Sequence, residues 1–215
     1  MSVSCIDHIV VTAPSLEAGA LFIKQTLGVD PQTGGEHPRM GTHNLLLRLG
    51  DSLFLEVIAV NPQAPAPARR RWFGLGDLAA GSRPALSTWV ARTPDIRTTS
   101  ASSSEPLGDI EPMTRGRLEW LIAIPSDGSV PVDGIGPHLI EWHTDPHPAS
   151  RLEERGLALI MLEIFHREPA RVSRLLESIG FSGPLTVSAL AGHTQPYLLA
   201  HIDTPQGRRQ LSVPS

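Results

Sequence analysis

The feature that most constrains the fold is a strand-like segment that occurs twice. Residues 6–14 read Ile-Asp-His-Ile-Val-Val-Thr-Ala-Pro, and residues 86–94 read Leu-Ser-Thr-Trp-Val-Ala-Arg-Thr-Pro. Both are rich in β-branched and apolar residues, as strands are, and both end at a proline, which interrupts a strand. Aligning the two prolines gives an offset of 80 residues and sets Thr88 against His8. This repetition predicts two copies of one structural unit.

The first copy has the order strand, helix and three strands. After the strand at 5–12, Ser15 is a suitable N-cap for a helix, and Gly28 is a suitable residue to end it. A glycine-marked stretch at 34–44, interpreted as a loop or a weak, irregular strand, then leads into a strand at 45–49, and a tight turn leads into a strand at 53–60. The first sixty residues therefore predict a βαβββ unit.

The same order continues along the chain with weaker signals. We expect a connector rich in proline and glycine, a degenerate second unit with strands at 118–124 and 137–144, and a third unit without a site. The third unit would comprise a strand at 157–165, a helix at 169–179, and strands at roughly 185–190, 197–203 and 208–213. The predicted boundaries are 1–61 for the first module, 62–84 for the connector, 85–147 for the second module and 155–215 for the third.

One apolar strand carries an imidazole, and another carries a carboxylate. His8 lies in the strand at 5–12, and Glu56 lies in the strand at 53–60. Burying either group without a partner would cost several kcal/mol, roughly. A metal ion, a polar cavity or a buried partner would each remove that cost. In the second unit, an offset of 85 residues pairs Glu141 with Glu56.

Composition excludes several classes of function. The net charge of −4 argues against a dedicated nucleic-acid or anionic-membrane partner. Cys5 is the only cysteine, so no internal disulfide is expected. Neither a signal peptide nor an apolar run of the ~20 residues needed to cross a bilayer is evident. These features predict a soluble cytoplasmic protein.

The sequence resembles the vicinal oxygen chelate superfamily, in particular its glyoxalase-like branch (the glyoxalase, bleomycin resistance and dioxygenase group). The resemblance rests on the DHIVV run at 7–11, the following helix with Gly28, the GTHNLLLRLG run at 41–50 and the FLEVIAV run at 54–60. It implies an α+β fold in which repeated βαβββ modules form a cupped mixed sheet. In that superfamily the cup often holds a divalent metal, and its chemistry includes lyases, isomerases, dioxygenases and metal-free binding proteins.

Carried over by position, the resemblance places metal ligands at His8, Glu56 and Glu141. The fourth position falls on Thr88, which is not a normal ligand for a catalytic divalent ion. One imidazole and two carboxylates would suit Zn, Mn, Ni or Fe with open positions for substrate, although a metal-free cup is also compatible with Thr88. A complete glyoxalase I site is absent, so that reaction is not expected.

Strand alternation predicts which other side chains face the cup. Arg48 would face inward, where it could pair with Glu56 or bind a substrate anion. The remaining candidates for substrate contacts are Asn44, His43, Trp120 and His143.

Two functions follow from the resemblance. The first is a metal-dependent lyase or isomerase, with Glu56 or Glu141 as general base if it is not a ligand; a dioxygenase is less favoured because it would need His143 as a second imidazole. The second is a metal-free protein that binds or sequesters an aromatic molecule. A homodimer is compatible with both, because such modules often complete their cup across two chains.

Overall fold

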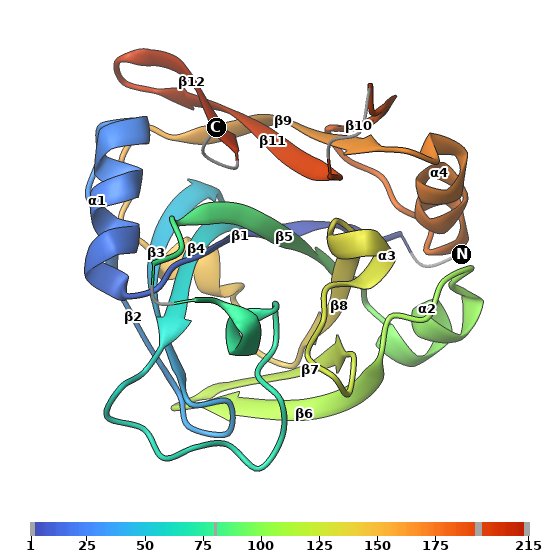
Figure 1. Cartoon of the computed structure of the whole chain (residues 1–215), viewed down its shortest axis with the longest axis horizontal. Helices are drawn as coiled ribbons and strands as arrows, with labels where there is room; N and C mark the ends of the chain where they lie inside the picture. The colour runs from blue at the N-terminus through green and yellow to red at the C-terminus, as the bar shows by residue number, and fades with distance from the viewer. Residues whose placement is uncertain (1–2, 80, 192–194, 213–215) are drawn as a thin grey trace.

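The computed structural model describes residues 3–79, 81–191 and 195–212. Its main element is an eight-stranded mixed sheet that curls into a cup (Figure 1), with strand order β2-β3-β4-β1-β5-β8-β7-β6. The first module comprises β1 (Cys5–Thr12), α1 (Leu16–Leu27), β2 (Gln32–His37), β3 (Thr42–Gly50) and β4 (Leu53–Val60). The second comprises β5 (Ala85–Arg92), α2 (Ile96–Ser102), β6 (Asp109–Arg115), β7 (Leu118–Ile124) and β8 (Pro137–Trp142). The predicted α+β fold with repeated βαβββ modules is confirmed.

Local sequence explains the boundaries of α1. The Ser15 hydroxyl accepts a hydrogen bond from the backbone N–H of Ala18 at 3.2 Å, which satisfies one free donor of the first turn. Gly28 has a left-handed φ of 77° and donates its N–H to the Lys24 carbonyl at 2.9 Å. The helix therefore begins and ends where the sequence predicts.

The two modules meet at β1 and β5, which pair in antiparallel fashion. His8 lies opposite Val90, and Thr88 lies opposite Val10. With the offset of 80 residues taken from the sequence repeat, His8 lies opposite the counterpart of Val10, and Val10 lies opposite the counterpart of His8. Under this offset, Thr88 and His8 occupy equivalent positions.

The cup has an apolar core on each face. The convex face packs against the helices through residues such as Ile9, Leu55 and Trp89. The concave face is lined by Val10, Ile58, Val90, Ile122 and Ile140, together with Trp72 and Phe73. These two aromatic residues come from the connector between the modules, which also contains the 3-10 helix η1 (Leu75–Asp77). The connector thus fills part of the concave side.

The last third of the chain forms a separate four-stranded sheet. It comprises β9 (Ala158–His166), α4 (Pro169–Ser178), β10 (Leu185–Ala189), β11 (Tyr197–Thr204) and β12 (Gly207–Ser212), in the sheet order β10-β9-β11-β12. Residue 213, included in the last predicted strand, lies outside the described residues. Short helices α3 (Pro131–Gly134) and η2 (Pro148–Arg151) precede this sheet.

This third unit keeps the predicted chain order but pairs its strands differently. β9 lies between β10 and β11, whereas the first strand of module one lies beside the last strand of that module. Leu162, Ile164 and Leu198 share the convex-face core with the eight-stranded sheet, and Figure 1 shows the small sheet beside β1 and β5, at the top of the view and opposite β6 and β7. It therefore covers the convex side of the cup, and none of its described residues lines the concave cavity.

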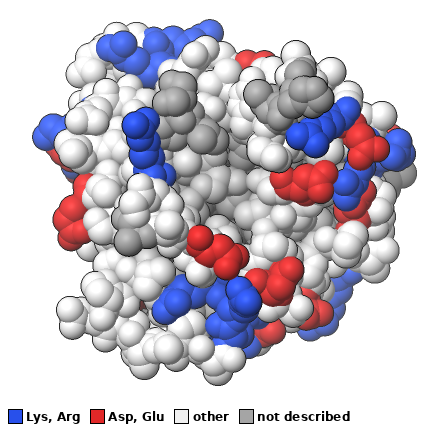
Figure 2. Space-filling model, viewed as in Figure 1, with Lys and Arg blue, Asp and Glu red and all other residues white. Residues whose placement is uncertain are grey.

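The surface carries both signs of charge. On the face shown in Figure 2, arginine and lysine side chains lie beside aspartate and glutamate around an uncharged, hollowed centre. Within the described residues, no helix is long and apolar enough to cross a membrane.

Candidate functional site

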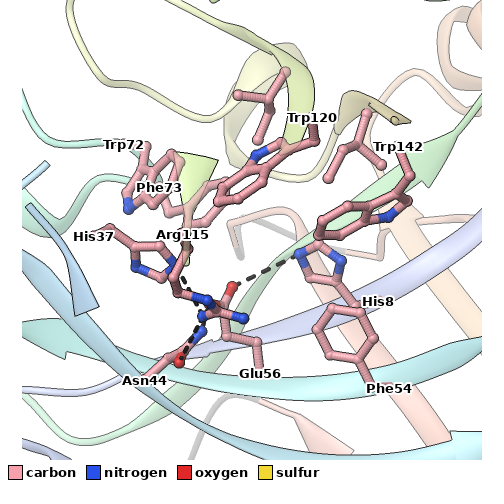
Figure 3. A pocket seen from close by; sticks show the side chains of 12 residues that line it. His8, His37, Asn44, Phe54, Glu56, Trp72, Phe73, Arg115, Trp120 and Trp142 are labelled. Atoms are coloured by element: carbon pink, nitrogen blue, oxygen red, sulfur yellow. Dashed lines mark hydrogen bonds and ion pairs between the residues drawn. The ribbon is translucent and has the colours of Figure 1, made fainter. Parts of the chain in front are cut away.

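The concave side of the sheet contains a small cavity of about 30 Å³. Every strand of module one contributes side chains to the wall of this cavity, whereas α1 contributes none. Module two and the connector supply the rest of the wall. The cavity is lined by His8, His37, Asn44, Phe54, Glu56, Trp72, Phe73, Arg115, Trp120, Ile122, Ile140 and Trp142 (Figure 3). A volume of this size holds about one or two water molecules. A second cavity, of about 350 Å³, shares His37, Trp72 and Trp120 with it.

His8 and Glu56 point toward one another in this cavity (Figure 3). Both are 5% exposed, and Nε2 of His8 lies 3.6 Å from Oε2 of Glu56. This separation is too long for a direct hydrogen bond. The two groups can therefore both contact a ligand atom placed beside them. The ring of His8 is also stacked on Phe54, with centroids 4.4 Å apart.

Behind His8 lies a fully buried carboxylate. Nδ1 of His8 is 2.6 Å from Oδ1 of Asp7, and because a carboxylate accepts, Nδ1 carries the proton. In the neutral form of His8, Nε2 then presents its lone pair to the cavity. A histidine oriented in this way serves either as a base or as a metal ligand.

Asp7 is held by further donors. Its Oδ2 accepts hydrogen bonds from Nε1 of Trp142 and Nε2 of His147, both at 2.9 Å. Burial by itself raises the pKa of Asp7, but the hydrogen bonds from His147 and His8 outweigh burial and hold that pKa well below its ordinary value. Asp7 therefore stays charged and fixes the tautomer of His8.

Glu56 is oriented by Asn44. The Asn44 amide nitrogen donates to Oε1 of Glu56 at 2.5 Å, and its oxygen accepts from the backbone N–H of Gly35 at 2.8 Å and from Arg115 at 3.2 Å. These partners define which end of the Asn44 amide is oxygen. Oε2 of Glu56 is left facing His8 and the cavity.

Arg115 reaches into the cavity from the end of β6. Its guanidinium donates to Nε2 of His37 at 3.3 Å, so Nδ1 of His37 carries a proton and donates to Thr42 at 3.2 Å. Burial lowers the pKa of His37 to about 3, with the Arg115 charge acting in the same direction. Burial also lowers the pKa of Arg115, and Glu56 partly offsets that effect. In the described part of the chain, Arg115 makes no ion pair with a carboxylate.

Glu141 does not join His8 and Glu56, which corrects the predicted three-residue cluster. Its Oε2 accepts from the backbone N–H of Ile96 at 2.8 Å, at the start of α2, and its Oε1 pairs with His143 at 2.8 Å. Both side chains thus lie on the helix side of β8, away from the cavity. The expectation that His143 faces the cup is wrong for the same reason.

The physical reason is register. β1 pairs Val10 with Glu56, and β5 pairs Val90, the counterpart of Val10, with His138. The counterpart of Glu56 is therefore His138, at an offset of 82 and not 85. The two offsets differ by three residues, which is an odd number. Glu141, the residue predicted with the offset of 85, therefore lies on the opposite face of the strand from His138.

Arg48 and His43 also lie outside the cavity. Arg48 pairs with Asp51, and its Nε lies 3.4 Å from Oε2 of Glu154, so neither the predicted pair with Glu56 nor a place in the cup is observed. His43 lies on the face of β3 opposite to Asn44, because neighbours on a strand alternate. Asn44 and Trp120 do line the cavity, as expected.

Several residues of the site were not predicted. They are Asp7, His37, Arg115, Trp72 and His147. The signal for Asp7 was its position in a β-branched run, where a buried carboxylate needs partners. Arg115 and Trp72 gave no such signal, because only the pairing of β6 with β7 and the path of the connector bring them to the cup.

The residues present do not fit the predicted metal site. Within the described ranges, no group of three or more histidine, cysteine, aspartate and glutamate side chains is arranged to hold a metal ion. His8 and Glu56 offer two ligands, and the Asn44 oxygen is already engaged by two donors. The Arg115 guanidinium beside them further disfavours a cation. We therefore assign no chemical step to a metal.

Comparison with known proteins agrees with this fold. A family model described as a glyoxalase-like domain matches residues 6–180. The chain belongs to the glyoxalase-like domain family. The resemblance to the vicinal oxygen chelate superfamily seen in the sequence is thereby confirmed. A search of curated protein sequences gave no significant match.

Solved structures resemble this glyoxalase-like protein at low sequence identity. A hypothetical protein from Staphylococcus aureus is 10% identical, with a TM-score of 0.61 over 89% of this chain and 87% of that chain. A variant of 4-hydroxymandelate synthase from Streptomyces coelicolor is 15% identical, with a TM-score of 0.52 over 98% of this chain and 63% of that chain. A variant of Streptomyces coelicolor methylmalonyl-CoA epimerase is 18% identical, with a TM-score of 0.44 over 65% of this chain and 97% of that chain. At these identities the likeness concerns the fold alone.

Proposed function

We propose that this glyoxalase-like protein is an acid–base isomerase or lyase that moves a proton on a small carboxylic acid without a metal ion. The observation that carries the proposal is the arrangement of Asp7, His8 and Glu56. The lone pair of His8 faces the cavity 3.6 Å from a second carboxylate, while a buried carboxylate holds the other ring nitrogen. A base that is positioned in this way contributes typically 10²–10⁴-fold to proton transfer.

The surroundings of Arg115 favour a substrate that carries a negative charge. A desolvated guanidinium without a carboxylate partner is costly, and a bound carboxylate would relieve that cost through two parallel hydrogen bonds. Asn44 and His37 hold the guanidinium by contacting one of its nitrogens. Its remaining N–H groups are thus left for a ligand.

The proposed step begins with a C–H bond next to a carbonyl group. Nε2 of His8 takes the proton, and the electron pair of that bond moves to the carbonyl oxygen. Asp7 stabilises the imidazolium because it accepts a hydrogen bond from Nδ1. Glu56 attracts the same imidazolium from the cavity side. Return of the proton to a different atom completes an isomerisation, and loss of a leaving group completes an elimination.

A second function is favoured by the aromatic wall. Phe54, Trp72, Trp120 and Trp142 surround the cavity, and Thr88 stands at the position equivalent to His8. Aromatic walls of this kind suit a protein that sequesters a flat molecule without changing it.

Hydrogen–deuterium exchange separates the two functions. Small 2-hydroxy, 2-oxo and 3-oxo acids are incubated with the protein in D₂O, and loss of the C–H signal is followed by proton NMR. We expect exchange for at least one acid and a fall of about 100-fold or more in His8→Gln. Arg115→Met should raise the half-saturating concentration about tenfold or more, because a charge-assisted hydrogen bond is lost. Arg208→Met, on the exposed face of β12, is the matched control.

Three results would change the conclusion. Saturable binding of an acid without exchange would establish the sequestering function in place of catalysis. Binding that is equal in the wild type and Arg115→Met would contradict the anionic substrate. Exchange that stops after EDTA treatment and returns with Zn, Mn, Ni or Fe would overturn the metal-free mechanism.

A further inference from the structure

His138 is the counterpart of Glu56 in the second module, and its side chain lies on the concave face. Ile140 and Trp142, two and four residues further along β8, line the cavity, and alternate residues of a strand share a face. The ring of His138 contacts Phe73, a residue of the concave core, with centroids 4.8 Å apart. Each module therefore contributes one ionisable side chain from its last strand to the same concave surface.

The hydrogen bonds of His138 define its tautomer. Nδ1 lies 3.1 Å from the Ala123 carbonyl oxygen, which only accepts, so Nδ1 carries the proton. Nε2 then has a lone pair, and it is buried without a partner among the described residues. Burial lowers the pKa of His138 to about 4, although the hydrogen bond to Ala123 acts in the opposite direction. His138 is thus a neutral acceptor at pH 7 and is 0% exposed.

Phe73, whose ring contacts that of His138, has a strained backbone. Its φ of 57° lies in the left-handed region, which residues other than glycine rarely adopt. Its ring stacks on Trp72 with centroids 5.1 Å apart and an angle of 10° between the planes. Nε1 of Trp72 is also buried without a partner. The connector therefore places a ring beside two unsatisfied nitrogens, and this arrangement costs free energy.

We propose that His138 is a second ligand-binding residue of the cup, and that Phe73 fills the place of a ligand ring until a ligand displaces it. The ligand ring then stacks on Trp72, and a hydroxyl group on that ring donates a hydrogen bond to Nε2 of His138. The inference deepens the proposed function by naming the substrate class, a planar ring that carries a hydroxyl group. It also explains how a cavity of about 30 Å³ could accept a ligand of that size.

Phenol and benzene are the probes, because they differ by the hydroxyl group alone. Phe73→Ala should bind phenol at least tenfold more tightly than the wild type, since no side chain has to move. In the double variant Phe73→Ala/His138→Leu, phenol affinity should fall at least fivefold while benzene affinity stays within twofold. Phe181→Ala, which removes a ring packed against Trp89 outside the cup, should gain no phenol affinity. If Phe73→Ala fails to fold, Phe73→Leu is used in the same series.

The wild type tests displacement directly. Titration with phenol should shift the nitrogen NMR signal of His138 Nε2, and benzene should not. Equal affinity of phenol and benzene for Phe73→Ala would overturn the role of His138. No response of His138 in the wild type, at phenol concentrations tenfold above those that saturate Phe73→Ala, would overturn the displacement of Phe73. The phenol titrations need no turnover, so failure of the proposed catalysis is distinguishable from failure of this inference.

Discussion

His147 donates its Nε2–H to Oδ2 of Asp7 at 2.9 Å, although the two residues lie 140 positions apart in the sequence. Nδ1 of His147 accepts from the backbone N–H of Ala149 at 3.2 Å, which fixes this tautomer. Together with Trp142 and His8, His147 gives Asp7 three N–H donors. The segment after β8 thus stabilises a carboxylate in β1, and that carboxylate orients His8.

Removing the Asp7 carboxylate should destabilise the protein strongly. In Asp7→Ala the three buried N–H groups lose their acceptor, and breaking such a buried network costs about 3–5 kcal/mol. Asp7→Asn should cost less, because one oxygen remains. Urea unfolding at pH 7 measures the change. Asp30→Asn, which breaks the exposed pair with Lys24, is the control and should change stability by less than about 1 kcal/mol. If Asp7→Ala lowered the free energy of unfolding by less than about 1 kcal/mol, the stabilising role of the hydrogen bonds to Asp7 would be contradicted.

Stability should fall as the solution is acidified from pH 7 to pH 4.5. The pKa of His138 is lowered by burial from 6.5 to about 4, and that of His37 to about 3. Between these values and 6.5 the unfolded chain binds a proton that the folded chain does not, so acid favours unfolding. This effect does not lower the free energy of unfolding above pH 6.5. Through His138 alone, acidification to pH 4.5 should lower the free energy of unfolding by about 2–3 kcal/mol.

His138→Leu provides the comparison for that pH series. Because this variant has no titrating group at the position, the difference in urea midpoint between pH 7 and pH 4.5 should shrink relative to the wild type. Equal differences in the two proteins would show that His138 is not buried in its neutral form. The low pKa of Asp7 acts in the same direction at lower pH, since its stabilisation is lost as pH falls below the ordinary aspartate value.

Gly19→Ala should destabilise the protein even though alanine favours helices. A Cβ at this position of α1 would lie 2.3 Å from Cγ1 of Val57 in β4. Overpacking costs typically about 1–3 kcal/mol, which exceeds the gain of about 1 kcal/mol from helix propensity. Thermal unfolding measures the loss. Adding Val57→Ala removes the clashing methyl groups, so Gly19→Ala should cost less in that background than in the wild type.

Glu141→Gln and Glu56→Gln should have different effects. Glu141 accepts a hydrogen bond from the first residue of α2, so its substitution should lower stability by about 1 kcal/mol and leave ligand affinity within twofold. Glu56→Gln alters the cavity itself and should change affinity or exchange rate about tenfold or more. The acid identified by deuterium exchange serves as the ligand in both titrations. A loss of affinity in Glu141→Gln equal to that in Glu56→Gln would restore Glu141 to the site.

Part of this result could be predicted from the sequence. The run 5–12, the caps of α1 and the 80-residue repeat depend on local patterning, and the structure confirms the strand and helix order of the first module and the antiparallel pairing of the two repeated strands. His8, Glu56 and Asn44 were also placed correctly, because alternation along β3 and β4 is regular.

The tertiary structure alone decided the second half of the site. Glu141 and His138 lie three residues apart on the same strand, and the sequence offers no measure of which one is paired with β5 in the position of Glu56. A shift by an odd number of residues exchanges the two faces of a strand. Arg115, Trp72 and His147 reach the cavity region through the pairing of β6 with β7 and through two connecting segments. Local sequence determines strands and turns through short-range sterics and polarity, whereas the meeting of distant side chains depends on the register and path of the whole chain.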